Sequence, residues 1–241
     1  MRLLFVSNLY PPRALGGMEH RCRETVELLR QRGHVCDVLT SSFARSGATM
    51  SNKPDVARLL RLEAGVYRYR PLDYLLHRRA QLRHNSEALT QVADSLRPDL
   101  VFFWGMWNLS PALIETAKAL FPLRVVQSFA GYWPVERDVH EQYWLAEAEV
   151  RFADLLRRSL APLALSRWYR PVRWSDVTFE HAIFVSQYVK DYLCQAGLDF
   201  PHARVIYSGI STDEFAPAPG QLPVTSGLRV LHAGGWASHK G

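Results

Sequence analysis

Residues 3–40 read LLFVSNLYPPRALGGMEHRCRETVELLRQRGHVCDVLT, and the fold prediction rests on this stretch. Residues 3–7 form a short apolar run of the kind found in buried strands, and residues 35–40 form a second one. Between them, apolar residues recur at helical spacing from Met18 to Leu29, and Gly33 stands where a helix commonly ends. A strand, a helix and a second strand in this order predict one unit of a parallel sheet.

The same alternation continues along the chain, apart from residues 41–65, which carry little regular pattern and are expected to form a loop. Repeated units of this kind imply a parallel sheet with helices on both faces. We therefore predict an α/β fold with a Rossmann-like parallel sheet. The further strands are expected at 66–70, 99–104, 124–128, 182–186, 204–207 and 228–233, and the further helices at 79–96, 110–121 and 187–196.

Two stretches interrupt this rhythm and suggest the domain boundaries. Residues 135–175 are expected to be a helical insert within an N-terminal domain that spans residues 1–216. Proline and glycine mark residues 217–227 as a linker. Residues 228–241 would then be the truncated start of a second domain, because one strand cannot form a domain by itself. The insert should carry one apolar helical stripe, made of Trp144, Ala148, Phe152, Leu155, Leu156 and Leu160.

The composition is that of an ordinary globular protein with an excess of positive charge. The chain has 241 residues, 48% of them hydrophobic, and a formal net charge of +6. Its three cysteines are far apart and include no Cys-x-x-Cys pair, which argues against a disulfide framework and a zinc ribbon. Seven arginines lie within residues 58–83 and six within 151–173. These clusters indicate either an anionic partner or a solvated basic face.

No segment of the sequence has the length of a membrane span. The first apolar run is too short for a signal peptide, and no stretch approaches the roughly 18 uncharged apolar residues of a spanning helix. We expect a cytoplasmic protein, with peripheral contact to the inner face of a membrane as an option. The arginine-flanked insert would either rest on an anionic membrane or pack on the sheet as a helical subdomain. No nucleic-acid-binding motif accompanies the arginines, so no nucleic acid is expected as a partner.

The loop after the first strand contains a glycine pair, Gly16-Gly17, immediately before the first helix. Glycine lets the backbone approach a ligand closely, and the free N–H groups at the start of a helix attract anions. The spacing is not Gly-x-Gly-x-x-Gly, which argues against a Rossmann oxidoreductase that binds a nicotinamide or flavin cofactor. The glycine pair is therefore a candidate phosphate site of another kind.

Four further segments follow this loop in a fixed order. They are RPDLV at 97–101, FVSQYV at 184–189, YSGISTDEFAP at 207–217 and VLHAGGWASHKG at 230–241. Together with Pro11-Pro12, Gly16-Gly17, Glu19 and Gly33-His34, they resemble glycosyltransferase family 4, whose members have the GT-B fold. The resemblance runs from residue 3 to residue 241, with gaps at 41–65 and 135–175.

The resemblance implies transfer of a hexose from a UDP- or GDP-linked sugar to a glycan, lipid-linked or small-molecule acceptor, as in polysaccharide biosynthesis. It implies no metal and no cofactor beside the nucleotide sugar, and the sequence has no Asp-x-Asp motif. The N-terminal domain of such enzymes mostly binds the acceptor, and the C-terminal domain mostly binds the nucleotide. On this basis, Gly16, Gly17 and Lys240 are candidates for donor and phosphate binding, and Glu19, Tyr132 and Trp133 are candidates for acceptor binding.

Two departures from the family pattern leave the catalytic residue unassigned. Ala130 stands where many relatives have a histidine close to the reacting sugar, and Gly235 stands where an arginine would contact the donor phosphates. His140 could substitute for the missing histidine, although a loop histidine is more often simply exposed. The alternative is a non-catalytic acceptor-binding domain, either a degenerate relative or half of a split enzyme. In both cases we expect the 241-residue chain to be inactive alone, because half a cleft cannot fix a donor or exclude water.

Overall fold

The computed structural model describes residues 1–43, 55–147, 151–210 and 212, with the backbone alone for 151–153. The chain divides into two units, Met1–Tyr207 and Ser208–Gly241. The expected linker at 217–227 and the expected second domain at 228–241 lie outside the described residues. The fold described below is therefore that of the first unit.

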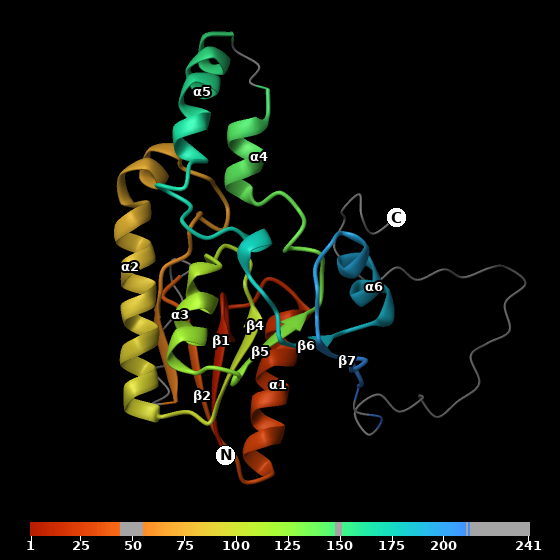
Figure 1. Ribbon diagram of the computed structural model, residues 1–241. Coiled ribbons are helices and arrows are strands. Elements are labelled where there is room, and N and C mark those ends of the chain that lie inside the picture. The colour runs from red at the N-terminus through yellow and green to blue at the C-terminus, as the bar shows by residue number, and fades with distance from the viewer. Residues whose placement is uncertain (44–54, 148–150, 211, 213–241) are drawn as a thin grey trace, which may run out of the picture. The chain divides into compact units, whose positions relative to one another are not determined.

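The first unit is built on a seven-stranded parallel sheet with the strand order β3-β2-β1-β4-β5-β6-β7 (Figure 1). The strands are short, and β1, β2 and β4 in the middle of the sheet are largely buried, as expected for parallel strands covered by helices, whereas the edge strands β3 and β7 are only partly buried. This arrangement confirms the predicted Rossmann-like α/β fold. The strands are β1 Arg2–Ser7, β2 Val35–Ser41, β3 Val56–Leu60, β4 Leu100–Gly105, β5 Val125–Phe129, β6 His181–Phe184 and β7 His202–Val205.

Helices cover both faces of this sheet because successive side chains of each strand point to opposite sides. Leu4 and Val6 of β1 belong to a core that includes residues of α2, α3 and α6. Leu3 and Phe5 belong to a second core that includes residues of α1. The helices are α1 Gly17–Gln31, α2 Pro71–Leu96, α3 Ala112–Leu120, α4 Val139–Leu145, α5 Arg151–Ala164 and α6 Gln187–Gln195, with a 3-10 turn at Trp174–Asp176.

The structure corrects the expected third strand and the start of the second long helix. The strand predicted at 66–70 is wrong, because β3 lies at Val56–Leu60, inside the stretch expected to be a loop. Helix α2 begins at Pro71, eight residues before the predicted start at 79. Proline is well suited to this first helical position. The inward positions of α2 include Arg78 and Asn85, so the helix lacks the apolar stripe that sequence patterns detect.

The insert at 135–175 forms α4, α5 and the 3-10 turn, and α4 and α5 extend beyond the carboxyl edge of the sheet (Figure 1). A small core of Tyr74, Trp144, Ala161 and Ala164 joins them to α2. The apolar residues predicted to form one helical stripe fall on two helices instead, because α4 ends at Leu145 and α5 begins at Arg151. Trp144 is buried, whereas Leu155, Leu156 and Leu160 are exposed. Ala148 and the side chain of Phe152 lie outside the described residues.

A buried ion pair connects α2 to the loop that follows β3. The guanidinium group of Arg78 contacts the carboxylate of Glu63, and both side chains are almost fully buried. The Nε2 atom of His140, at the start of α4, lies 3.5 Å from Glu63 Oε2. Burial would raise the pKa of Glu63, but the charge of Arg78 and the contact with His140 outweigh burial and hold it at about 2. Glu63 is therefore ionised at neutral pH.

A second set of charged groups fixes the insert internally. Arg170, which is buried, donates to Glu141 Oε1 at 2.7 Å and to Asp138 Oδ2 at 2.5 Å. Asp138 also caps α4 by accepting from the backbone N–H groups of His140 and Glu141, at 3.0 and 2.9 Å. The segment after α5 is thus held against the start of α4 by bonds to charged groups, which are stronger than bonds between neutral groups.

The carboxyl ends of β1 and β4 approach each other closely at Gly105. A Cβ atom on Gly105 would lie 2.5 Å from Asn8 Oδ1 and 3.1 Å from Ser7 Oγ. Both of these side chains are buried, so neither can swing into solvent to make room. Glycine at position 105 is therefore required for the side chains of Ser7 and Asn8 to pack against β4.

Replacing Gly105 by alanine should lower the free energy of unfolding by about 1–3 kcal/mol, the usual cost of overpacking a buried site. Urea denaturation of the chain measures this loss. Gly131→Ala is the control and should change stability little, because no atom lies within 4 Å of the added Cβ. Equal stabilities of the wild type and Gly105→Ala would contradict the close approach.

Replacing Glu63 by glutamine should lower the free energy of unfolding by about 3–5 kcal/mol at pH 7, because Arg78 is left buried without its carboxylate. Asp73→Asn is the control, since Asp73 pairs with Arg70 at 3.6 Å on the exposed surface. Its effect should stay below about 1 kcal/mol. Urea denaturation of the two variants makes the comparison.

The effect of Glu63→Gln should also depend on pH. The pKa of Glu63 is about 2 in the fold against an ordinary 4.5. Its ionised form therefore stabilises the protein fully above pH 4.5, and this stabilisation is lost as the pH falls from 4.5 towards 2. The difference in stability between the wild type and Glu63→Gln should narrow over that window. A difference that is constant with pH would contradict the assignment.

Candidate active site at the carboxyl edge of the sheet

A crevice is expected where the strand order of an open parallel sheet reverses, at the carboxyl ends of the two strands involved. In this sheet the reversal falls between β1 and β4. Strands β2 and β3 continue the sheet on the side of β1, and strands β5 to β7 continue it on the side of β4. Asn8 follows β1 and donates its N–H to the carbonyl of Gly105 in β4, at 2.8 Å. The candidate site is built around this point.

The loop between β1 and α1 is held in place by two arginines. Arg58 of β3 donates to the carbonyl oxygens of Tyr10 and Pro11, at 3.2 and 2.8 Å. Arg13 is buried and donates to the carbonyls of Ser42, at 3.2 Å, and Phe43. These bonds satisfy backbone carbonyls that have no partner in the sheet, as buried polar groups require. They fix the path of the chain up to the glycine pair.

Gly16 and Gly17 are exposed at the start of α1, and no atom lies within 4 Å of a Cβ built on either one. Both glycines are therefore open to a ligand. The backbone N–H of Gly16 donates to Glu19 Oε2 at 3.0 Å. This leaves the first N–H groups of the helix, at Gly17 and Met18, as the groups that an anion would meet.

Glu19 lies in the first turn of α1 and is buried. Its carboxylate is engaged by the Gly16 amide rather than directed at open solvent. A carboxylate in this position satisfies a free N–H and interacts favourably with the positive end of the helix. In this structure Glu19 shapes the glycine loop.

Tyr132 and Trp133 follow β5 at the same edge, but their side chains diverge. The Trp133 ring stacks on Phe129 of the core at 5.2 Å and meets Trp174 at 4.4 Å. The Tyr132 ring lies 4.5 Å from Tyr192 of α6. Both side chains pack against the main core, and Tyr132 in addition belongs to an aromatic group with residues of α6.

That aromatic group contains two residues that the sequence analysis missed, Tyr188 and Tyr192. Both are exposed, they lie one helical turn apart on α6, and their rings are 6.4 Å apart. Tyr132, Tyr188 and Tyr192 together present aromatic faces beside the loop after β5. Their spacing of four residues was visible in the sequence, but nothing there linked it to Tyr132.

His140 is buried, in contrast to the exposure expected of a loop histidine, because it lies in the first turn of α4. Its ring is 4.1 Å from that of Tyr74 and 5.0 Å from that of Tyr69. With Glu63 beside it, the ring is surrounded by protein groups. Ala130, which replaces the histidine of many relatives, is half-buried in the loop after β5.

Lys240 and Gly235, which were predicted for the donor side, lie outside the described residues. Within the described residues, no group of three or more His, Cys, Asp or Glu side chains is arranged to hold a metal ion.

No helix in the described part of the chain is long and apolar enough to span a membrane. Gly16, Gly17, Glu19 and Tyr132 are therefore the predicted site residues that line the carboxyl edge.

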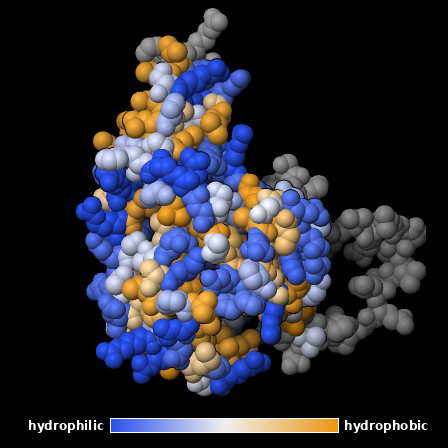
Figure 2. Space-filling view, viewed as in Figure 1, coloured by the Kyte–Doolittle hydropathy of each residue, from blue (hydrophilic) through white to orange (hydrophobic). Residues whose placement is uncertain are grey.

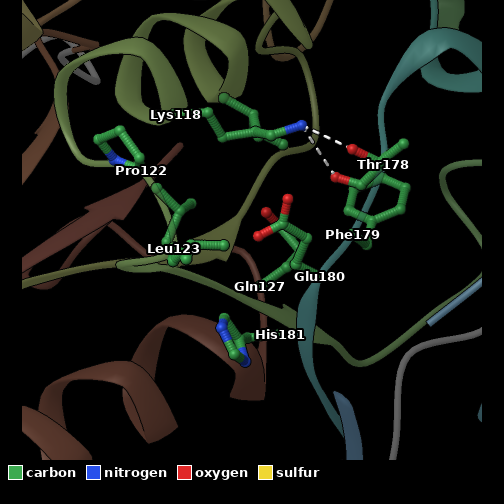
Figure 3. Close-up of a pocket in the computed structure, with 10 residues that line it drawn as sticks. Lys118, Pro122, Leu123, Gln127, Thr178, Phe179, Glu180 and His181 are labelled. Carbon is green, nitrogen blue, oxygen red and sulfur yellow. Dashed lines mark hydrogen bonds between the residues drawn. The ribbon is translucent and has the colours of Figure 1, made fainter. Parts of the chain in front are cut away.

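The cavity drawn in Figure 3 lies at the opposite edge of the sheet, beside the first residues of β5 and β6. It encloses about 140 Å³ between the end of α3 and the segment before β6. Lys118 donates across it to the Thr178 Oγ1 and carbonyl oxygens, at 2.8 and 3.3 Å. This cavity lies at the amino ends of the strands, whereas the candidate site lies at their carboxyl ends, so the cavity does not belong to the candidate site.

Comparison with known proteins identifies the family of the chain. The model of the family described as Glycosyltransferase Family 4 matches residues 15–214. A search of curated proteins finds no match. Two solved structures are similar at low identity: the UDP-N-acetylglucosamine 2-epimerase of Rickettsia bellii (13% identity, TM-score 0.45) and Anabaena HepE with UDP and glucose (16%, TM-score 0.44).

The match to the first covers 85% of this chain and 44% of the epimerase, and the match to the second covers 91% and 47%. The chain thus spans less than half the length of either structure. These likenesses are too weak to carry an argument about function. The family match is different, because it extends over most of the chain. On that match, the chain belongs to glycosyltransferase family 4.

Proposed function

We propose that the whole protein transfers a hexose from a UDP- or GDP-linked sugar to a glycan, lipid-linked or small-molecule acceptor. The reaction would take place at the carboxyl edge of the sheet, beside the β1–β4 crevice. The observation that carries this proposal is the open glycine pair, Gly16-Gly17, at the start of α1 next to that crevice. Its exposure lets a ligand reach the backbone N–H groups of the helix directly.

The donor would bind with its phosphates towards Gly17 and with Lys240 supplying a positive charge. Glu19 already occupies the Gly16 N–H and places a negative charge beside it. A diphosphate close to Gly17 would therefore need a compensating cation from the rest of the protein. Lys240 is our candidate for this cation, in place of the arginine that Gly235 replaces.

The acceptor would contact Tyr132 together with Tyr188 and Tyr192. Exposed aromatic rings offer an apolar face and a hydroxyl group, which suits the mixed surface of a sugar. Trp133 would support this surface from the side of the core, because its ring stacks on Phe129. Glu19 would act by holding the glycine loop rather than by touching the acceptor.

The reaction we propose uses no metal ion and no cofactor beside the nucleotide sugar. The protein would work in the cytoplasm, in contact with the inner face of a membrane and without a nucleic-acid partner. The 241-residue chain alone should be inactive, because half a cleft cannot fix a donor or exclude water. The second candidate function, a non-catalytic acceptor-binding domain, is favoured by one observation: the buried position of His140, which leaves Ala130 without a substitute histidine.

The donor site can be tested with Gly17→Leu in the polypeptide encoded by the whole reading frame. No atom lies within 4 Å of a Cβ built at Gly17, so the melting temperature should stay the same, but the leucine side chain would block the ligand's approach. Release of nucleoside diphosphate from a panel of UDP- and GDP-sugars, with EDTA present, should fall at least tenfold. Glu24→Leu, on the exposed side of α1, is the control.

No turnover by the wild type with any donor, combined with measurable acceptor binding, would establish the non-catalytic alternative. Turnover that disappears with EDTA would contradict metal independence. Turnover unaffected by Gly17→Leu would remove the glycine pair from the donor site.

The acceptor surface predicts different effects for the two neighbouring aromatic residues. Tyr132→Ala and Tyr192→Ala should raise KM for the acceptor severalfold with little change in kcat, because they remove binding that is uniform through the reaction. Trp133→Ala should instead lower the melting temperature, because its ring packs against Phe129 and Trp174. Steady-state kinetics with varied acceptor, together with thermal denaturation, separate these effects. An unchanged KM in both tyrosine variants would contradict the proposed acceptor surface.

A further inference from the structure

Helix α5 turns an apolar side to the solvent. Ala161 and Ala164 are buried against Tyr74 and Trp144 of the small core. A surface helix normally faces its core with apolar residues and solvent with polar ones, but α5 exposes leucines. At 100° per residue, the exposed leucines fall within about 140° of the helix circumference. They are Leu155, Leu156, Leu160 and Leu163.

The first turns of α2, which pack on α5 through Tyr74, also expose leucines. Leu72 and Leu76 are 70% and 75% exposed, so the fold gains little from their side chains. Arg79 and Arg83 follow them at spacings that keep all four residues on one stripe of the helix. The stripe therefore changes along its length from apolar to positively charged. We call Leu72, Leu76 and the four exposed leucines of α5 the leucine surface.

A groove of about 290 Å³ lies beside the charged half of this stripe. Arg79, Arg83, Arg167 and Trp168 line it, and the guanidinium group of Arg79 lies 3.8 Å from the centre of the Trp168 ring. Arg167 is paired with Asp176. Arg79 and Arg83 have no carboxylate partner in the part of the chain that the structure describes. The groove thus offers two uncompensated positive charges.

We propose that the leucine surface and this groove bind the interface of an anionic phospholipid bilayer. Figure 2 shows hydrophobic residues gathered over the part of the molecule formed by α5 and the start of α2. Helices that lie in a membrane interface place leucines about 5–10 Å into the boundary and keep arginines at the level of the phosphates. Arg83 follows Leu76 by seven residues, about 10 Å along α2, so the arginines lie close to the exposed leucines. Trp168, 60% exposed, has the amphipathic ring typical of this zone.

The charges favour a bilayer over a second copy of the chain as the partner. Two copies joined through this surface would bring Arg79 and Arg83 of each towards like charges of the other, which is unfavourable. An anionic bilayer instead gains about 1 kcal/mol for each arginine near it. The exposed indole of Trp168 beside the same charges is also typical of a membrane surface.

This surface specifies the membrane contact of the proposed function, and any link between membrane binding and a lipid-linked acceptor rests on that function. Helices α4 and α5 extend beyond the carboxyl edge, so a protein bound through α5 would have its candidate site on the membrane side (Figure 1). Membrane binding itself does not depend on sugar transfer. Membrane binding and sugar transfer are therefore measured separately. Vesicle binding is measured without any nucleotide sugar, and transfer is measured with a soluble acceptor.

Sedimentation of the full chain with vesicles tests the proposal. We expect binding to vesicles of 30% phosphatidylglycerol in phosphatidylcholine, much weaker binding to phosphatidylcholine alone, and loss of binding to the anionic vesicles at high salt. Arg79→Gln with Arg83→Gln should lower the partition coefficient roughly fivefold for each arginine. Leu156→Ser with Leu163→Ser should lower it about tenfold or more.

The control pair is Leu28→Ser with Leu123→Ser, two leucines that are as exposed but lie elsewhere. This pair should leave vesicle binding unchanged. Circular dichroism should show the same fold for every variant, because all the substituted side chains are exposed. Failure of the wild type to bind anionic vesicles would overturn the proposal. An equal loss of vesicle binding in the control pair would also overturn it. So would sedimentation equilibrium that shows a dimer of the wild type and a monomer of the Leu156/Leu163 variant, if that variant still binds vesicles.

Discussion

The parallel pairing of β1 with β4 is the interaction on which the rest of the molecule depends. All strands of the described sheet run in one direction, so their carboxyl ends meet at one edge, and the strand order reverses between these two. The absence of a side chain at Gly105 lets Asn8 approach there. The glycine loop, the Tyr132 loop and the insert all lie towards this edge. The order of the strands thus places the candidate site at this edge.

Much of the fold could be predicted from the sequence, because most strands are continuous apolar runs and α1 has a clear periodicity. Strand β3 was missed since it carries Arg58, whose guanidinium is used to hold the carbonyls of Tyr10 and Pro11. A polar residue with a specific partner does not look like part of a buried strand. The early turns of α2 were missed for the same reason, because Arg78 is buried only by virtue of its pair with Glu63.

The candidate site was less predictable, because it depends on which way side chains point. The position of the glycine pair between a strand and a helix already marks it as a candidate site, and the structure describes it as open. Neither spacing nor resemblance could show that Glu19 bonds to Gly16, or that neighbouring Tyr132 and Trp133 face different elements. These outcomes follow from contacts with residues far away in the sequence. Burial of His140 likewise required Tyr69 and Tyr74 to come together around it.

The arginine bonds to the loop after β1 have a consequence for the thermodynamics of ligand binding. Arg13 and Arg58 restrict the backbone of this loop in the free protein, from the Tyr10 carbonyl onward. Its conformational entropy is therefore lost when the protein folds and not when a ligand arrives. A ligand that meets an already ordered loop loses less of its interaction energy to ordering. A ligand at the glycine pair would therefore need few contacts to bind.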